Sequence, residues 1–513
     1  MIGPFLNAQL PPVLYNLHCS PFFVIPKVGR PGEYRPLHHC SYPRSGLNLN
    51  ASLDPQYCTT QYLTLKEIIT WIVSIGPKPY LWIVDATDAY FRCPVHPDDW
   101  HLLGIQYDKY YLAFTCLPQG SSSSPYIYTL FSDAILYITV NANKKLFYVN
   151  KQILLQHYLD DFFGAHNNKK EAQAQYDAMI EWFKKLGLPT TLHKCTPPAF
   201  IMKILGWLHN TELQTVKLPE KQRLKCLARA LAIYLAETTT IKELQQCIGS
   251  LMHASQVYWA GKSFVRRIQR HLFNPAFGPN PAGSQTVTLT DWDKQDLKWW
   301  IDILPTLHNG ISYQTILKPA YKTDIRVYTD ASSKIGIGGW SSQDKCYQTR
   351  WENTFLKEVE KKRGIATVDI QLMELLGLIV AAKLWAPTWR GKAVTFYIDN
   401  PGAYHAVKEQ CAALHRLDMD CLVRQLCELS IKFEFKFWVI LILGKNNGRA
   451  DALSRYYPVN TSYKLTYEQN STVNFATNNC LAQLLTEPLN GKIPPNYRPA
   501  TKEFNNTRTH RRY

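Results

Sequence analysis

The stretch Gln156-His157-Tyr158-Leu159-Asp160-Asp161-Phe162-Phe163 places two adjacent aspartates between apolar flanks. Like charges repel, and an apolar setting disfavours ionisation, so this arrangement is costly unless a cation relieves it. A tight turn between two strands would expose both Asp160 and Asp161 to such an ion. An ordinary solvated hairpin turn can carry the same two residues, so the stretch by itself leaves both interpretations open.

Earlier in the chain, Asp85 directly follows the apolar run Leu81–Val84, which predicts a strand. Magnesium suits such carboxylates because it is a hard ion that takes carboxylate oxygens together with substrate phosphates. Two metal ions ~3.5–4 Å apart can activate a primer 3′-hydroxyl and stabilise a leaving pyrophosphate. Mg²⁺, with Mn²⁺ as a substitute, would therefore suit a site built from these carboxylates.

Three motifs in this order resemble those of reverse transcriptases: VDATDAYF (84–91), LPQGSSSSP (117–125) and YLDD (158–161). The resemblance implies that Asp85 and Asp160 are the main metal ligands and that Asp161 supports them. It also implies that Tyr90 is an aromatic gate beneath the sugar of the incoming nucleotide, although a core aromatic is the plain alternative. Gln119 and Gly120 would lie along the nucleotide and template, where a missing side chain permits close backbone approach.

The run SPFFVIPKVGRPGEYRPLHHCSYP (20–43) resembles the fingers motif of the same enzymes. Lys27 and Arg35 fall where the family has its triphosphate-binding residues, and Arg suits phosphate through bidentate donation. The HHCSYP form (38–43) departs from the acidic run of most LTR-type enzymes and resembles DIRS-like retroelements, which integrate with a tyrosine recombinase. A gypsy-type LTR element or a pararetrovirus remains the alternative source.

A helical pattern from Leu218 to Leu272 includes a capping box at Thr240 and Glu243 and resembles the thumb of the DIRS-like group. Arg266, Arg267 and Arg270 share one helical face, which suits the backbone of a primer–template duplex. A solvated basic face is the alternative for each of these arginines.

Four further acids recur near the C-terminal end of the chain. Asp330 and Asp399 each follow a predicted strand, 325–329 and 394–398, Glu374 lies in an apolar helix, about 368–385, and Asp451 lies in NNGRADALSR. A lone glutamate in so apolar a helix is costly unless something positive meets it. The set resembles a type-1 RNase H domain, which implies that these acids hold two Mg²⁺ ions for cleavage of an RNA phosphodiester. Leu441 stands where many such domains have a histidine that helps product release, and we therefore expect slower cleavage.

The composition agrees with a polyanionic partner. Lys and Arg number 57 against 40 Asp and Glu, which gives a net charge of +17, although a basic protein without a nucleic-acid role has the same excess. The 13 cysteines form no CxxC pair, which is typical of reduced thiols without a zinc site. The apolar run Phe437–Leu443 is too short to span a bilayer and predicts a buried strand. We expect an intracellular protein of the cytoplasm, the nucleus or both, with no membrane partner.

The predicted fold class is α+β: a right-hand polymerase with fingers, palm and helical thumb, followed by an RNase H-like α/β domain. The expected partners are an RNA template, a DNA primer, an RNA–DNA hybrid and dNTPs, with an element-encoded recombinase as a further candidate. A decayed or domesticated copy that binds nucleic acid without catalysis is the alternative function. The predicted segments are partial fingers and the start of the palm (1–84), palm with interleaved fingers (85–210), thumb (211–285), connector (286–323), RNase H-like domain (324–455) and a flexible basic tail (456–513).

Overall fold

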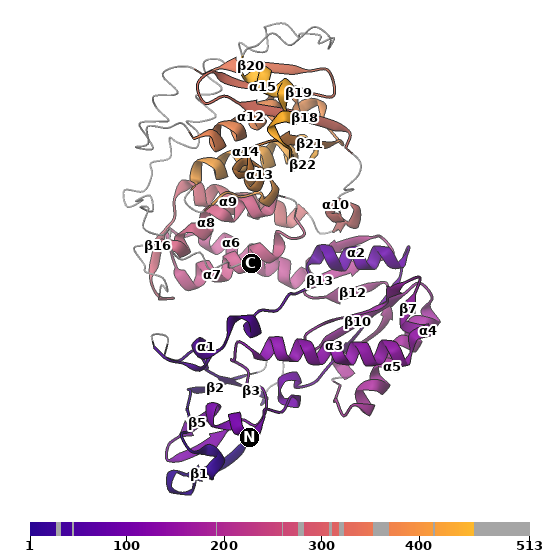
Figure 1. Ribbon diagram of the computed structural model, residues 1–513, viewed down its shortest axis with the longest axis vertical. Helices are drawn as coiled ribbons and strands as arrows, with labels where there is room; N and C mark the ends of the chain where they lie inside the picture. Colours follow the sequence, from indigo (N-terminus) through magenta and orange to yellow (C-terminus); the bar gives the residue numbers. More distant parts are fainter. Residues whose placement is uncertain are drawn as a thin grey trace. The chain divides into compact units, whose positions relative to one another are not determined.

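The computed structural model divides into two compact units (Figure 1), Met1–Pro219 with Gly310–Leu317 and Glu220–Asn309 with Lys318–Tyr513. The residues that it describes are 1–26, 32–43, 46–190, 192–258, 260–274, 282–306, 310–317, 323–351, 369–413 and 416–455. The predictions for Lys27 and for the basic tail, 456–513, therefore lie outside the described residues.

The first unit is built on an antiparallel sheet with the strand order β11-β4-β10-β9. Trp82, Val84 and Phe162 are buried on one face, against helices α3 (Ser124–Ala142) and α5 (Lys169–Lys185). Phe163 points to the other face because successive side chains of a strand alternate, and its ring meets Trp71 of α2 (Leu65–Ile75) edge-on. The strands are β4 (Tyr80–Asp85), β9 (Leu155–Tyr158), β10 (Asp161–His166) and β11 (Thr196–Ala199).

Smaller elements precede and connect this sheet. The predicted fingers motif forms a hairpin of β2 (Phe22–Pro26) and β3 (Tyr34–His38). A second small sheet has the order β1-β6-β5. Its strands and the remaining short elements are β1 (Ile2–Leu6), β5 (Gly104–Tyr107), β6 (Tyr110–Ala113), α1 (Leu49–Ser52), α4 (Lys144–Phe147), β7 (Tyr148–Val149) and β8 (Gln152–Ile153).

The predicted connector, 286–323, is not a separate segment, and this prediction was wrong. Residues 310–317 belong to the first unit, where β17 (Ile311–Ser312) pairs with β14 (Thr215–Lys217). Helix α10 (Tyr313–Leu317) follows, and its fully buried Tyr313 hydroxyl lies 3.2 Å from Nδ1 of buried His209 in β13 (Trp207–Asn210). Strand β12 (Ile201–Ile204) completes this sheet. His209, the partner of Tyr313, lies about a hundred positions upstream. A local sequence pattern therefore could not reveal that residues 310–317 belong to the first unit.

The second unit begins with helices. The predicted capping box at Thr240 and Glu243 is confirmed: it begins α7 (Ile241–Ala254), whose buried face includes Leu244 and Leu251. Strand β16 pairs with β15 directly before this helix, and α9 packs along α6, so most of the supposed connector is part of this helical layer. The elements are α6 (Glu220–Leu235), β15 (Thr238–Thr240), α8 (Arg266–Gln269), β16 (Thr286–Thr288) and α9 (Asp291–Thr306).

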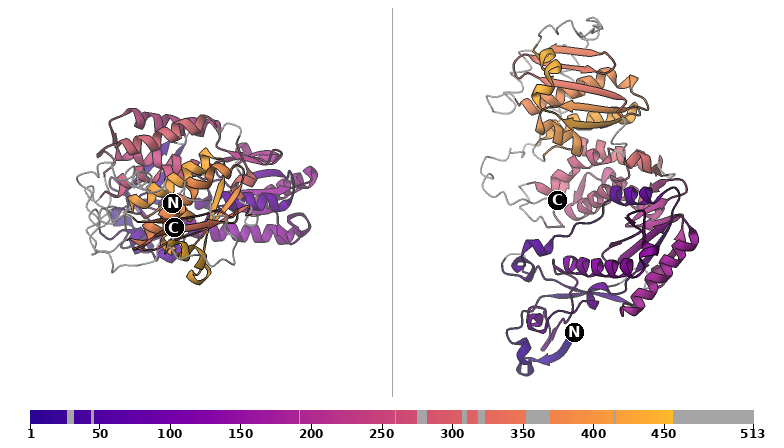
Figure 2. Two further views of the ribbon diagram at one scale, coloured as in Figure 1. Left: turned by 90° about the horizontal axis from the view of Figure 1, so that it is seen from above. Right: turned by 45° about the vertical axis from the view of Figure 1, so that its right-hand side comes forward.

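The same unit contains a five-stranded sheet of order β20-β19-β18-β21-β22 (Figure 2). Strands β18, β19 and β20 are antiparallel, while β18, β21 and β22 are parallel. The predicted combination of an α+β polymerase with a following α/β domain is confirmed. The elements are β18 (Ile325–Ala331), β19 (Gly336–Ser341), β20 (Cys346–Arg350), α12 (Ile370–Trp385), β21 (Ala393–Ile398), α13 (Pro401–Glu409), α14 (Leu417–Lys432), β22 (Lys436–Leu441) and α15 (Gly448–Ser454).

Helices α12 and α15 cover opposite faces of this sheet. A side chain at Gly377 of α12 would lie 3.8 Å from Cγ2 of Ile337, whereas one at Gly338 would lie 2.4 Å from Cβ of Leu453 in α15. Ile337 and Gly338 are neighbours on β19, so their side-chain directions oppose each other. Ile370–Thr388, which begins with α12, is the one stretch of the described residues that is long and apolar enough to cross a bilayer, and 72% of it is buried inside the unit.

The prediction of a buried strand at 437–443 was partly wrong. Phe437 is buried, but Ile440, Leu441 and Leu443 are exposed to 43%, 42% and 63%. Strand β22 forms one edge of its sheet and ends at Leu441, which agrees with the exposure of its last apolar side chains.

Candidate active sites

The first acidic cluster lies where β4 ends and β10 begins. Asp85 and Asp161 are directly opposite each other in the register of the two strands. Asp160 lies in the tight turn between β9 and β10, where Leu159 adopts a left-handed φ of 52°. Two hydrogen bonds hold the turn: buried Ser132 donates to the Leu159 carbonyl at 2.9 Å, and the amide of Ala86 donates to the Asp160 carbonyl at 3.0 Å. The three predicted aspartates are therefore brought together.

The electrostatics of this cluster fit a bound cation. Burial raises the pKa of Asp160, and the charge of Asp85 raises it further. Burial, followed by repulsion from Asp160 and Asp85, raises the pKa of Asp161 to about 7. The two aspartates are thus poorly stabilised as anions by the protein alone, and a divalent cation supplies the charge that they lack.

Lys194 is a site residue that the sequence analysis missed. Its ammonium group donates to both carboxylate oxygens of Asp85 at 3.0 Å each, while about half of its side chain stays exposed. Its charge also lowers the pKa of Asp160 and Asp161. Nothing in the sequence distinguishes it among 57 basic residues, because the short turn Leu192–Lys194 that delivers it lies far from the motifs.

Aromatic side chains surround the same aspartates. Tyr90 is half-buried beside Tyr128, with ring centroids 5.7 Å apart, and burial followed by the nearby Tyr62 and Asp160 raises its pKa to about 12. Tyr62 lies against Tyr158 of the YLDD turn at 4.8 Å. Tyr90 thus stays a neutral phenol next to the acids at physiological pH, which suits a steric role near a sugar.

The LPQG loop is held by the HHCSYP region. The amide of His38 donates to the carbonyl of Gln119 at 2.9 Å, and Asn50 donates to the carbonyl of Gly120 at 3.0 Å. Gly120 has a φ of 139°, and a side chain there would lie 1.8 Å from the carbonyl oxygen of His38. Only glycine fits this approach. His38 is 1% exposed, and its Nε2 lies 3.1 Å from the Gly104 carbonyl.

Arg35 lies exposed in β3, opposite Ile25 of β2. Its charge lowers the pKa of Asp160, so the guanidinium group acts electrostatically on the acidic cluster. A cation at this position suits the predicted contact to a triphosphate.

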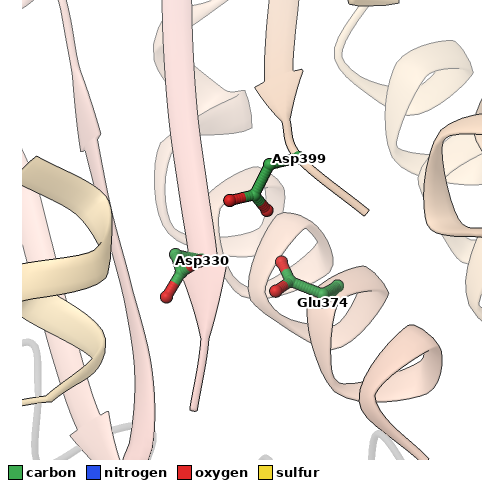
Figure 3. Close-up of side chains that lie close together, drawn as sticks. All are labelled: Asp330, Glu374 and Asp399. Atoms are coloured by element: carbon green, nitrogen blue, oxygen red, sulfur yellow. The ribbon is translucent and has the colours of Figure 1, made fainter. Parts of the chain in front are cut away.

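The second acidic cluster lies in the second unit, at one end of the five-stranded sheet. Asp330 comes from β18, Glu374 from α12, and Asp399 directly follows β21. Each offers one carboxylate oxygen, and these oxygens all lie within 4.8 Å of one another. Figure 3 shows Glu374 and Asp399 pointing toward β18, where Asp330 lies.

This cluster also fits a cation. Glu374 is 4% exposed, and its Oε1 accepts from the amide of Ala331 at 3.2 Å. Its Oε2 is buried and has no hydrogen-bond partner among the described residues. Burial, followed by repulsion from Asp330 and Asp399, raises the pKa of Glu374 well above its usual range, and burial raises that of Asp330 to about 6. An orphaned carboxylate oxygen facing two further acids is the donor set that a hard divalent ion takes.

Asp451, the fourth predicted acid, lies in α15 and is not among the three oxygens that converge. Its carboxylate accepts from Nε of Arg455 at 2.8 Å. Its charge nevertheless raises the pKa of Asp330, Glu374 and Asp399, so it stands close enough to join a site that a cation would draw together.

Residues 25–209, which contain the first cluster, match the family model described as reverse transcriptase (RNA-dependent DNA polymerase). This segment is therefore similar to a reverse transcriptase domain. Solved structures of foamy viral protease-reverse transcriptase also resemble the chain at 15% identity over 83% of its length. The TM-scores are 0.45 for the complex with RNA/DNA hybrid, 0.43 for the dRH form with ds DNA and 0.40 for the complex with dsDNA. The chain covers 50%, 66% and 78% of those chains, respectively.

Outside residues 25–209, Leu441 is the last residue of β22. It pairs with Ile398 across β21 and β22, one residue before Asp399, and is 42% exposed. The position is therefore next to the second acidic cluster and open to solvent.

The prediction that Arg266, Arg267 and Arg270 present one face to a duplex was wrong for the fold described. Arg267 is 6% exposed and forms a bidentate ion pair with fully buried Asp296 of α9. Arg270 pairs with buried Asp420 of α14, and Arg266 donates to the carbonyl of Ala412 at 3.2 Å. These contacts join the helical layer to the sheet domain within the second unit. A helical repeat shows which residues share a face, but not which segment covers it.

Proposed function

We propose that this chain synthesises DNA from dNTPs on RNA and DNA templates and cleaves the RNA strand of RNA–DNA hybrids. The observation that carries the proposal is the pairing of Asp161 with Asp85 beside the turn at Asp160, inside the segment that is similar to a reverse transcriptase domain. The cluster of Asp330, Glu374 and Asp399 supports the second activity. A net charge of +17 agrees with nucleic-acid partners, because each neutralised phosphate releases a counterion.

In the polymerase site, Asp85, Asp160 and Asp161 would hold Mg²⁺ or Mn²⁺. Such an ion would withdraw charge from the phosphate oxygens, which favours attack by the primer 3′-hydroxyl and departure of pyrophosphate. Arg35 suits the triphosphate because a guanidinium donates two parallel hydrogen bonds to phosphate. Lys194 neutralises Asp85. Its ammonium group is therefore also available to the negative charge of the triphosphate. Tyr90 limits the space beneath the sugar, which disfavours a 2′-hydroxyl.

In the nuclease site, Asp330, Glu374 and Asp399 would hold the cation, and Asp451 would complete the set. The protein's contribution is to bury Glu374 at a fixed position, so that its orphaned oxygen remains available to the cation. Leu441 is the one position that differs from the expected set, because its side chain offers no proton donor or acceptor beside Asp399.

We further propose that the enzyme serves a DIRS-like retrotransposon and acts inside the cell, with an element-encoded recombinase as a partner. The HHCSYP run supports this, because it departs from the acidic run of most LTR-type enzymes and resembles DIRS-like retroelements. A tyrosine-recombinase frame next to the gene would support the element type. A gypsy-type LTR element or a pararetrovirus would lack that frame.

Primer extension on an RNA template with Mg²⁺ tests the polymerase proposal. The paired variant Asp160→Asn/Asp161→Asn is expected to lose extension, while Glu374→Gln, which alters only the second cluster, keeps it. Equal extension by the wild type and the aspartate variant contradicts the proposal. A nucleic-acid-binding copy without catalysis would bind the duplex but extend no primer.

A further inference from the structure

Ser454, the last residue of α15, is fully buried and touches the nuclease cluster. Its Oγ lies 2.6 Å from Oδ2 of Asp330 and 2.8 Å from the main-chain oxygen of Asp451. It therefore links α15, the helix that carries the fourth acid, to β18, the strand that carries the first.

The hydroxyl has one proton and two neighbouring acceptors, so it can donate to only one of them. The Asp451 oxygen already accepts the main-chain N–H of Arg455 at 3.1 Å. Among the described residues, Oδ2 of Asp330 accepts no other hydrogen bond, and an ionised carboxylate is the stronger acceptor. The proton of Ser454 is therefore directed to Asp330 when that carboxylate is ionised.

This contact fixes the orientation of Asp330. The terminal torsion of an aspartate is soft, so an unpartnered carboxylate rotates about its Cβ–Cγ bond. With Oδ2 held by Ser454, the plane of the carboxylate is set relative to Glu374 and Asp399, whose oxygens lie within 4.8 Å. A cation would therefore bind carboxylate oxygens that are already oriented, and binding would not have to order them.

The sheet makes room for this contact. At Gly338 of β19, which pairs with Asp330, a Cβ atom would lie 2.4 Å from Cβ of Leu453 and 2.5 Å from the amide nitrogen of Ser454. Real Cβ atoms do not approach other atoms so closely, and the neighbouring atoms belong to a packed helix. Glycine at this position thus lets α15 sit low enough on the sheet for the serine to reach Asp330.

We propose that Ser454 is a positioning residue of the nuclease site: it orients Asp330 for divalent-cation binding and ties α15, with Asp451, to β18. This inference rests on the proposed RNase H function. Neither Ser454 nor Gly338 belongs to the acidic set that the sequence motifs predict, and the serine acts through Asp330 without touching substrate.

The test measures Mn²⁺ binding, with the free ion quantified by its electron paramagnetic resonance signal. The full chain would carry Asp160→Asn/Asp161→Asn, so that the polymerase site takes up little metal. Ser454→Ala is expected to weaken Mn²⁺ binding roughly tenfold, the lower end of what the loss of a partner behind a metal ligand costs. Ser430→Ala is the matched control, because Ser430 is equally buried in the same unit and donates to the carbonyl of Phe435 at 2.6 Å. It is expected to leave Mn²⁺ binding unchanged.

Equal Mn²⁺ affinity of the Ser454→Ala and Ser430→Ala proteins overturns the proposal. Circular dichroism melting accompanies each titration, and if Ser454→Ala does not fold, Ser454→Cys, a weaker donor of similar size, replaces it under the same criterion. Hybrid cleavage by the wild type separates the two claims. Binding that depends on Ser454 without any cleavage refutes the nuclease function alone, whereas cleavage with binding independent of Ser454 refutes the positioning role alone.

Discussion

At the residue scale, the acids of both sites were predictable because each lies at the end of a strand, in the turn between two strands or in a helix, with a recognisable flank. Their partners were not. Lys194 reaches Asp85, and Ser454 reaches Asp330, from positions more than a hundred residues away in the chain. A lysine or a serine carries no local signal of such a contact, since both residue types are common on ordinary surfaces and turns.

The identity of residue 441 should limit the nuclease rate. Leu441→His is expected to raise hybrid cleavage on the order of tenfold, part of what a positioned acid–base group contributes, because the side chain is exposed beside Asp399. Cleavage rates at saturating Mg²⁺ are the measurement. Leu443→His is the control, since Leu443 is also exposed but lies beyond the end of β22. No gain from Leu441→His, or an equal gain from both changes, counts against this explanation.

The raised pKa values predict how Mg²⁺ stabilisation depends on pH. The folded-state pKa of Asp161 is raised to about 7 and that of Asp330 to about 6, above unfolded values of ~3.9. Without metal, the stability that these groups contribute is present below pH ~4 and is lost as the pH rises through 6 to 7. Mg²⁺ binds the ionised forms and offsets this loss.

The melting temperature should therefore gain more from Mg²⁺ at pH 8 than at pH 5.5, measured by calorimetry on the wild type. The combined variant Asp161→Asn/Asp330→Asn is expected to flatten the difference between the two pH values. A gain from Mg²⁺ that is the same at both pH values would show that the acids do not bind the ion.

At the scale of elements, the sequence predicted the capping box before α7, the strands β4, β18 and β21 and the apolar helix α12. Each has a strong local pattern: a Thr and a Glu three residues apart, or an unbroken apolar run. The environment of residues 266–270 was not predictable, because the acids that neutralise Arg267 and Arg270 lie in α9 and α14. The supposed nucleic-acid face is instead an internal junction.

Asp296 is the centre of that junction, since its carboxylate accepts from Arg267 and, at 2.9 Å, from Nε of Arg424. Asp296→Asn would leave two poorly exposed guanidinium groups without their anion, and the free energy of unfolding should fall by about 3–5 kcal/mol. Asp302→Asn on the same helix is the control, because its pair with Lys298 is exposed and should matter by less than ~0.5 kcal/mol. Urea denaturation followed by circular dichroism measures both. A loss at Asp296 no larger than at Asp302 would contradict the structural role.

At the scale of the whole molecule, the two acidic clusters lie in two separately compact units. Unit boundaries were harder to predict than sites, because residues 310–317 return to the first unit through β17 and Tyr313. Two sites on two units should be separable by mutation. Glu374→Gln is expected to abolish hybrid cleavage and leave primer extension within about twofold of the wild type.

The central claim is that Asp85, Asp160 and Asp161 form a DNA-polymerising site. The most direct test is extension of a labelled DNA primer on an RNA template with Mg²⁺ and dNTPs, comparing the wild type, Asp160→Asn/Asp161→Asn and Glu374→Gln. We predict that the wild type and Glu374→Gln extend the primer and that the aspartate variant loses at least about 10³-fold in rate, as expected when metal-held charge stabilisation is removed. Extension by the aspartate variant at the wild-type rate, or no extension by the folded wild type, would contradict the claim.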